Sequence, residues 1–160
     1  MSSAHQNLSS YNPSDLPSVG NKRFAVVVAE WNSEITFSLL AGALDTLRSH
    51  GVAEQNIETI YVPGSFELVA GASIIYKHHK PDAVICLGCV IQGETRHFDF
   101  ICNAVANGLV NLSAQHAAPF IFGVLTTDNM EQAKDRSGGK HGNKGVEAAV
   151  TAIKMIGLIQ

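Results

Sequence analysis

Apolar residues occur along this chain in four short runs, and each run is followed by a stretch in which apolar positions recur at helical spacing. The runs cover Phe24–Ala29, Ile57–Val62, Ala83–Ile91 and Phe120–Leu125. Such runs are typical of strands in a parallel sheet that is covered on both faces.

The stretches after the runs predict helices. The first helix follows Ser33, which can act as its N-cap, and ends at Gly51. Three more are expected over about Phe66–His79, His97–His116 and Val146–Leu158. Strands that alternate with helices form a parallel sheet between helical layers. The expected fold class is therefore α/β, a three-layer α/β/α sandwich with a four-stranded parallel sheet.

The two ends of the chain differ from its middle. Residues Met1 to Asn21 are rich in Ser and Asn, and they have neither the apolar region of a signal peptide nor the arginines of a transit peptide. We expect residues 1–21 to form a mobile arm, ordered only against a neighbouring molecule, and residues 22–160 to form a single domain. Near the C-terminus, Ser137–Gly145 predicts a compact turn rich in Gly and Lys.

Composition narrows the classes of protein that fit. Apolar residues make up 46% of the 160 residues and charged residues 16%, which excludes a disordered chain. Eleven Lys and Arg against 14 Asp and Glu give a net charge of −3, so nucleic acid and anionic membranes are not expected as partners. The apolar runs are also too short to span a bilayer.

Three cysteines are too few for a disulfide scaffold, which predicts a cytoplasmic protein. Cys86 and Cys89 are three residues apart in one expected strand and should therefore face opposite sides of the sheet. No metal site is expected from them.

In an open parallel sheet, ligands bind beyond the carboxyl ends of the strands. Four loops lie there in this chain: Glu30–Ser33, Pro63–Glu67, Gln92–His97 and Thr126–Arg136. The first contains the only tryptophan, Trp31, followed by Asn32. The indole of Trp31 either packs half-buried or stacks on a flat heterocycle.

The second and fourth loops each allow two interpretations. Ser65 can cap the following helix and Glu67 can interact with the helix dipole, or the pair can bind a polyol through its hydroxyl groups. In the fourth loop, Arg136 is either a solvated charge or a guanidinium fork that holds phosphate. Lys140 and Lys144 lie nearby, and solvated charge is the preferred reading for Lys140.

The third loop, QGETRH, is the most informative. Gly93 permits close backbone approach, and the N–H groups of Glu94 and Thr95 are expected to open a helix, which is a natural cradle for phosphate. Histidine titrates near neutral pH, so His97 is a candidate proton carrier, although a lone histidine is more often structural or a surface residue.

Five motifs follow one another along the chain: RFAVVVAEWN, VPGSFEL, LGCVIQGETRHFDF, PFIFGVLT and DRSGGKHGNKGVEAA. In this order and spacing they resemble the 6,7-dimethyl-8-ribityllumazine synthase family. The resemblance covers about Lys22 to the C-terminus and leaves only the arm outside. It implies a flavodoxin-like fold and an enzyme of the transferase class that needs no cofactor.

The resemblance also implies a reaction and a set of site residues. The enzyme would condense 5-amino-6-ribitylamino-uracil with 3,4-dihydroxy-2-butanone 4-phosphate to 6,7-dimethyl-8-ribityllumazine, releasing phosphate and water, in the penultimate step of riboflavin biosynthesis. His97 would be catalytic, and Glu94, Thr95 and Arg136 would bind the phosphate. The implied substrate-binding residues are Trp31, Asn32, Ser65, Phe66, Glu67, Cys89, Val90, Ile91, Lys144 and, from an adjacent subunit, Phe122.

At position 94 the family often has a small residue. The carboxylate of Glu94 would therefore have to turn outward while its backbone N–H points to the phosphate.

The resemblance further implies homopentamers with active sites between subunits, and riboflavin synthase as a candidate partner. Twelve pentamers can form an icosahedral shell, and the compact Ser137–Gly145, without an insertion, favours that 60-mer here. Two other classes fit the fold: a non-catalytic flavin- or nucleotide-binding module and a purely structural shell protein. His97 beside a phosphate cradle favours the enzyme.

Overall fold

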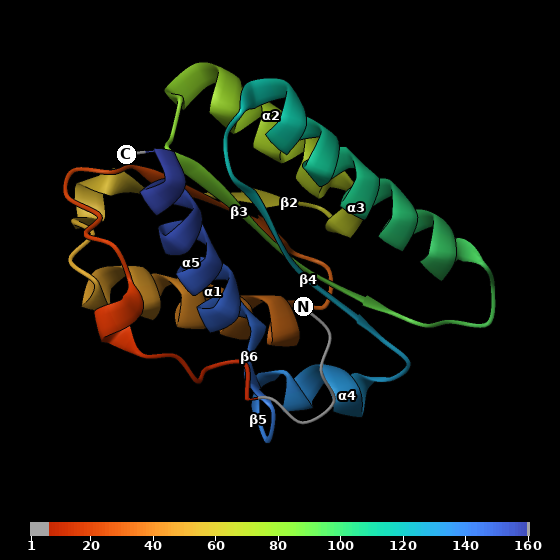
Figure 1. Cartoon of the computed structure of the whole chain (residues 1–160). Coiled ribbons are helices and arrows are strands. Elements are labelled where there is room, and N and C mark those ends of the chain that lie inside the picture. Colours follow the sequence, from red (N-terminus) through yellow and green to blue (C-terminus); the bar gives the residue numbers. More distant parts are fainter. Residues whose placement is uncertain (1–6, 160) are drawn as a thin grey trace.

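The computed structural model describes residues 7–159 of the chain. Four parallel strands form one sheet in the order β2-β1-β3-β4 (Figure 1). The strands are β1 (Phe24–Ala29), β2 (Ile57–Val62), β3 (Ala83–Ile91) and β4 (Phe120–Thr127). The helices are α1 (Ser33–Ser49), α2 (Leu68–His79), α3 (His97–His116), α4 (Met130–Asp135) and α5 (Lys144–Ile156). The predicted fold class is confirmed.

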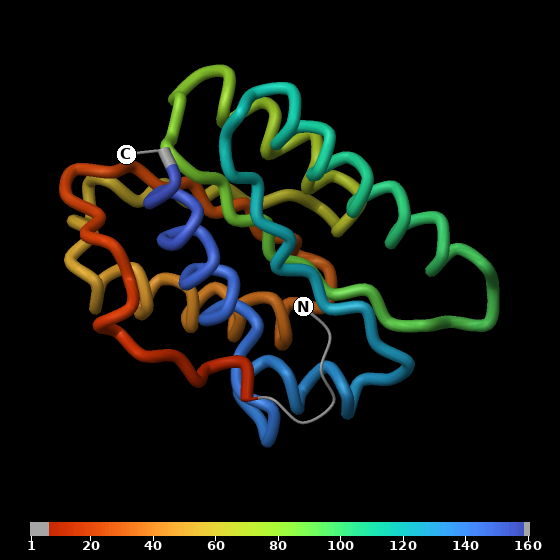
Figure 2. The backbone as a smooth tube through the Cα atoms, viewed as in Figure 1, coloured from red at the N-terminus to blue at the C-terminus, as the bar shows by residue number. Residues whose placement is uncertain are grey.

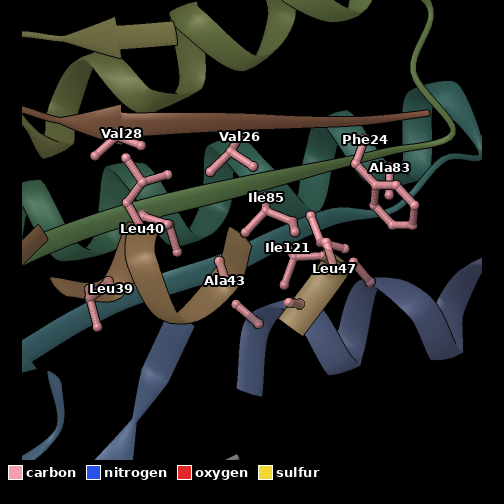
Figure 3. Packing of buried hydrophobic residues seen from close by; sticks show 14 of the residues in the cluster. Phe24, Val26, Val28, Leu39, Leu40, Ala43, Leu47, Ala83, Ile85 and Ile121 are labelled. Atoms are coloured by element: carbon pink, nitrogen blue, oxygen red, sulfur yellow. The ribbon is translucent and has the colours of Figure 1, made fainter. Parts of the chain in front are cut away.

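Helices α1 and α5 cover one face of the sheet, and α2 and α3 cover the other (Figures 1 and 2). Successive side chains of β1 alternate between these faces, because Phe24 and Val26 pack toward α1 and α5 while Ala25 and Val27 pack toward α2 and α3. Figure 3 shows Phe24 and Val26 in the cluster that also contains Leu47 of α1. Both faces are buried, which explains why the strand sequences are mostly apolar.

Most element bounds agree with the sequence pattern. Strands β1, β2 and β3 have the predicted bounds, and β4 extends beyond its predicted end to Thr127. The prediction that Ser33 caps α1 is wrong, because Ser33 is already helical and Asn32 is the N-cap. Helix α2 begins at Leu68, since Ser65–Glu67 form a 3-10 turn ahead of it.

The region before α5 holds two elements that the sequence pattern does not predict. Helix α4 lies within the expected loop Thr126–Arg136, and Asn129 caps it by accepting a hydrogen bond from the Gln132 N–H (2.9 Å). The expected turn contains a hairpin of β5 (Ser137–Gly139) and β6 (Gly142–Asn143). A helix of six residues and strands of two or three residues are too short to show a hydrophobic period.

Residues 7–21, part of the segment expected to be a mobile arm, lie along their own chain (Figure 2). The Leu8 N–H donates to the His141 carbonyl (2.8 Å), and the Asn143 N–H donates to Ser9 Oγ (2.9 Å). Val19 is buried in the core beside α1 and α5. Residues 1–6 of the expected arm lie outside the described residues.

The three cysteines are free thiols. Cys86 packs on the α2 and α3 side of the sheet and Cys89 on the α1 and α5 side, as predicted for residues three apart in a strand. Among residues 7–159, no three His, Cys, Asp or Glu side chains are grouped so that they could hold a metal ion. Within this described part, no helix has the length and apolarity needed to cross a membrane.

Candidate active site

A cleft of about 640 Å³ lies at the carboxyl ends of β1, β2 and β3, beside the start of α3. Three of the four loops selected from the sequence meet in it. Its lining residues are Trp31, Asn32, Gly64, Ser65, Phe66, Glu67, Cys89, Val90, Ile91, Gly93, Thr95, His97, Phe98, Phe100 and Ile101. The fold therefore brings together most of the residues that the sequence analysis selected, from segments far apart in the chain.

Trp31 presents an aromatic surface to this cleft. The residue is 72% exposed, although it is the bulkiest of the first loop. Its backbone N–H donates to the Pro63 carbonyl (3.1 Å), and the Glu30 N–H donates to the Val62 carbonyl (2.8 Å), so the loops after β1 and β2 are joined. An indole left open on the wall of a cleft can stack on a flat ring.

Asn32 adopts a left-handed backbone conformation (φ 59°, ψ 45°) and makes no side-chain capping bond to α1. Its Nδ2 donates instead to the Cys89 carbonyl at 3.0 Å. The side chain therefore connects the loop after β1 to the end of β3.

Ser65 lines the cleft, but its hydroxyl is buried beneath the surface. The residue is only 7% exposed, and its Oγ has no hydrogen-bond partner among the described residues. Gly64, not Ser65, is the N-cap of the 3-10 turn, so capping does not account for this hydroxyl. A buried polar atom without a partner is unusual in a folded protein, and this one faces Gly88 of β3, where a Cβ would come within 2.7 Å of it.

Glu67 and Phe66 extend outward from the same turn and are exposed. Glu67 Oε2 lies over Gly64, where a Cβ would come within 3.1 Å of it. A glycine at position 64 therefore leaves room for the carboxylate to fold back along the cleft.

The loop after β3 differs in one respect from the prediction. Helix α3 begins at His97, so Glu94 and Thr95 precede the helix rather than open it. Thr95 Oγ1 accepts a hydrogen bond from the His97 N–H (3.4 Å). Glu94 is exposed and is not part of the cleft lining, whereas Gly93 and Thr95 are.

His97 is the first residue of α3, and its exposed side chain lines the cleft. Trp31 reaches the same cleft from the loop after β1. A side chain that can carry protons and a surface that can hold a flat ring are thus combined in one site.

Besides Glu94, three of the selected residues lie outside the cleft lining. Phe122 and Lys144 line a second cavity of about 590 Å³ beside β4 and α5, where Lys144 Nζ pairs with Glu147 Oε1 at 2.7 Å. Arg136 follows α4, and its Nη1 donates to the Gln132 carbonyl (3.2 Å). The chain by itself does not bring these three side chains into the cleft.

Cys89 lines the cleft and is almost completely buried. Burial raises the pKa of its thiol to about 11, so the thiol is protonated at neutral pH. A protonated thiol is a poor nucleophile, so the side chain of Cys89 is not poised for covalent chemistry.

The apolar side of the cleft is not among the candidate site residues predicted from the sequence. Phe98, Phe100 and Ile101 line it from the beginning of α3, and Phe100 is 71% exposed. The available signal was a pair of aromatic residues in the first turn of a helix that follows a candidate ligand loop.

The fold and cleft together define a parallel α/β protein with a small-molecule site at the carboxyl edge of its sheet. Residues 21–160 match the sequence profile of 6,7-dimethyl-8-ribityllumazine synthase. The chain belongs to this family.

Curated relatives with the same name are similar over nearly their whole length. The 6,7-dimethyl-8-ribityllumazine synthase of Cytophaga hutchinsonii is 58% identical over 156 residues, which cover 98% of either chain. That of Parabacteroides distasonis is 52% identical over 156 residues, with the same coverage. That of Porphyromonas gingivalis is 51% identical over 158 residues, covering 99% of this chain and 98% of the relative.

Proposed function

We propose that the cleft beside Trp31 and His97 is where this chain forms 6,7-dimethyl-8-ribityllumazine from 5-amino-6-ribitylamino-uracil and 3,4-dihydroxy-2-butanone 4-phosphate. The transferase activity itself follows from membership of the family. The location of the active site is supported by one observation: the exposed indole of Trp31 and the exposed His97 line the same cleft at the carboxyl edge of the sheet.

The pyrimidine substrate has a flat ring and a polyol tail, and the cleft offers a match for both. Trp31 stacks on the ring, and backbone groups of Cys89, Val90 and Ile91 bind its polar edge. The ribityl chain lies along Ser65, Phe66 and Glu67. The exposed Glu67 carboxylate supports this assignment, because it can accept hydrogen bonds from hydroxyl groups.

The reaction requires proton transfers and no electron transfer. The 5-amino nitrogen attacks the ketone carbonyl and releases water to give an imine, phosphate then leaves, and the ribitylamino nitrogen closes the ring with loss of a second water. No electrons are gained or lost overall, so no redox cofactor is needed. His97 carries protons between these groups, and the cleft holds the reactants together, which can supply roughly 7–11 kcal/mol of the barrier.

The phosphate of the second substrate needs positive or N–H-donating groups. The backbone N–H groups of Glu94 and Thr95 bind it within the chain, with the Glu94 carboxylate turned to solvent. Arg136 anchors it through its guanidinium group. Because Arg136, Phe122 and Lys144 lie outside the cleft of their own chain, they complete the cleft of a neighbouring subunit.

This sharing of sites makes the homopentamer the minimum active assembly. The hairpin over Ser137–Asn143 is short, and it leaves the sixty-subunit icosahedral shell as the expected full assembly. Residues 22–160 act as the single catalytic domain, and riboflavin synthase, which consumes the product, is the expected partner. Three free thiols fit a cytoplasmic location.

Mixing the assembled protein with both substrates tests the proposal. Product is expected as a new near-ultraviolet absorption band and its fluorescence. Trp31→Ala should raise the KM for the pyrimidine by about tenfold, and Trp31→Phe should restore most of the affinity, because aromatic pairs contribute about 0.5–1.5 kcal/mol beyond their burial.

The matched control is Tyr61→Ala, since Tyr61 is also an exposed aromatic residue but lies outside the cleft. It should leave the KM for the pyrimidine unchanged. Tight binding of a flavin with no turnover would overturn the proposal in favour of a non-catalytic binding module.

A further inference from the structure

Near the end of β3, the carbonyl group of Cys89 lies beyond the reach of strand β1. Strand β1 pairs with β3 only as far as Val28 with Leu87, and β1 ends at Ala29. Strand β3 continues to Ile91, so the Cys89 carbonyl lies beyond the paired region. Asn32 Nδ2 donates to this carbonyl at 3.0 Å. The Asn32 amide thus supplies the hydrogen bond that a longer β1 would have supplied.

The backbone of Asn32 makes this contact possible. Its left-handed conformation turns the chain sharply between β1 and α1, and asparagine tolerates this conformation better than most residues. Aspartate would tolerate the same backbone but cannot donate to a carbonyl when ionised, and glycine has no side chain. Position 32 therefore requires a left-handed backbone and an amide donor at once, and asparagine satisfies both.

The same contact fixes the residue next to it. The Trp31 backbone is held on one side by its own N–H bond to the Pro63 carbonyl (3.1 Å) and on the other by Asn32. Trp31 is 72% exposed, so few packing contacts hold the ring in place. The backbone on either side therefore sets the point from which the indole extends over the cleft.

We propose that Asn32 is a positioning residue: its amide bond to the Cys89 carbonyl holds the Trp31 ring over the cleft for the flat ring of the pyrimidine substrate. The proposal rests on the proposed function for the identity of that ligand. It gives Asn32 a role through Trp31, exerted by the one amide N–H that donates to the Cys89 carbonyl.

Asn32→Asp and Asn32→Gly test the proposal, since both tolerate the left-handed backbone and both lose the amide donor. Each should raise the KM for the pyrimidine by about tenfold, which is the largest change expected from the loss of one hydrogen bond. Each should change the KM for the phosphate substrate by less than about twofold. Lys80→Gly is the matched control, because Lys80 has a similar left-handed backbone (φ 48°) outside the cleft.

A readout independent of activity separates this proposal from the proposed function. Trp31 is the only tryptophan in the chain, so its time-resolved fluorescence anisotropy reports the mobility of this ring alone. Without any substrate, Asn32→Asp and Asn32→Gly should show faster motion of Trp31 on the nanosecond scale, and Lys80→Gly should not.

Unchanged Trp31 mobility in both Asn32 variants would overturn the proposal. If pyrimidine binding is weaker in those variants while the mobility is unchanged, Asn32 contacts the substrate directly. If the unaltered protein makes no product, the proposed function fails, but the anisotropy still decides whether Asn32 holds Trp31.

Discussion

Gly145, in the first turn of α5, lies directly against the main-chain carbonyl of Leu39 in α1, so closely that a Cβ on Gly145 would overlap the carbonyl oxygen. The side chain of Asn143 supports this contact, because its Nδ2 donates to the Ser38 carbonyl (2.9 Å) and its Oδ1 accepts from the Gly145 N–H (2.8 Å). The start of α5 is therefore fixed to α1 by backbone-to-backbone contact.

Gly145→Ala should lower the free energy of unfolding by about 1–3 kcal/mol, because the added methyl group forces two helix backbones apart. Replacing a glycine inside a helix by alanine usually raises the free energy of unfolding, so the expected change has the opposite sign. Chemical denaturation measures the free energy of unfolding. Gly93→Ala is the control, since a Cβ there would meet no atom within 4 Å. Equal stability of the two variants would refute the close contact.

His97→Ala should lower kcat while the KM for the pyrimidine changes little, because the ring is held by other residues. The loss should be no more than about 10²-fold, the low end of what positioned acid–base catalysis contributes, since holding the reactants together supplies most of the rate. Steady-state kinetics across the pH range measure it. A kcat unchanged at every pH would remove His97 from the mechanism.

Arg136→Ala should raise the KM for the phosphate substrate far more than the KM for the pyrimidine. Arg136→Lys should recover only part of the loss, because a point charge replaces a guanidinium fork. Lys140→Ala is a suitable control, since Lys140 is an exposed cation that pairs with Asp135 (2.7 Å). If both KM values rise together in Arg136→Ala, the residue supports structure and the phosphate binds elsewhere.

The thiols should differ in reactivity. Cys86 and Cys89 are buried, and Cys102 is only partly so. At pH 8 a thiol reagent should label Cys102 alone in the folded protein and all three cysteines after unfolding in urea. Cys102→Ser should abolish the labelling of the folded protein. Rapid labelling in that variant would mean that the sheet opens readily.

Stability should also fall at high pH because of these thiols. Burial raises the pKa of Cys89 from about 9.0 to about 11, and it raises the pKa of Cys86 as well. Below pH 9 the thiols are protonated in both the folded and the unfolded chain, and the free energy of unfolding is unaffected by them. As the pH rises from 9 toward 11, the unfolded chain loses these protons first, and the free energy of unfolding falls by about 1.4 kcal/mol per pH unit for each thiol. Urea unfolding between pH 7 and pH 10.5 measures the slope, and Cys86→Ala combined with Cys89→Ala should flatten it.

Light scattering at neutral pH tests the assembly. We expect a particle of sixty chains, with five chains as the minimum active unit. A stable particle of five chains would exclude the shell, and a catalytically active monomer would exclude sites shared between subunits.

Much of the fold can be predicted from the sequence because its main elements are long and strongly patterned. Three strands have their predicted bounds, and the rule that ligands bind at the carboxyl edge selected three loops that do meet in one cleft. Helix α4 could not be predicted in the same way, since its six residues span less than two helical turns.

Long-range contacts limit what the sequence predicts about the site. The bond from Asn32 to Cys89 joins residues 57 positions apart, and no local pattern in either loop indicates it. Similarly, the position of Arg136 after β4 predicts that it lies in a ligand loop. Helix α4 lies between β4 and Arg136, and Arg136 is not among the residues that line the cleft. Which ends of the strands meet is a property of topology, whereas which side chains meet depends on packing.

The contact between α5 and α1 also has a consequence for synthesis of the chain. Helix α5 is the last of the described α-helices, so a ribosome can release β1, α1 and β3 well before residues 144–156 emerge. During that interval the face of α1 and the sheet that α5 covers is exposed, including Leu39 and Ala43 (Figure 3). A nascent chain that stalls before Lys144 would present this apolar face to other chains and to chaperones.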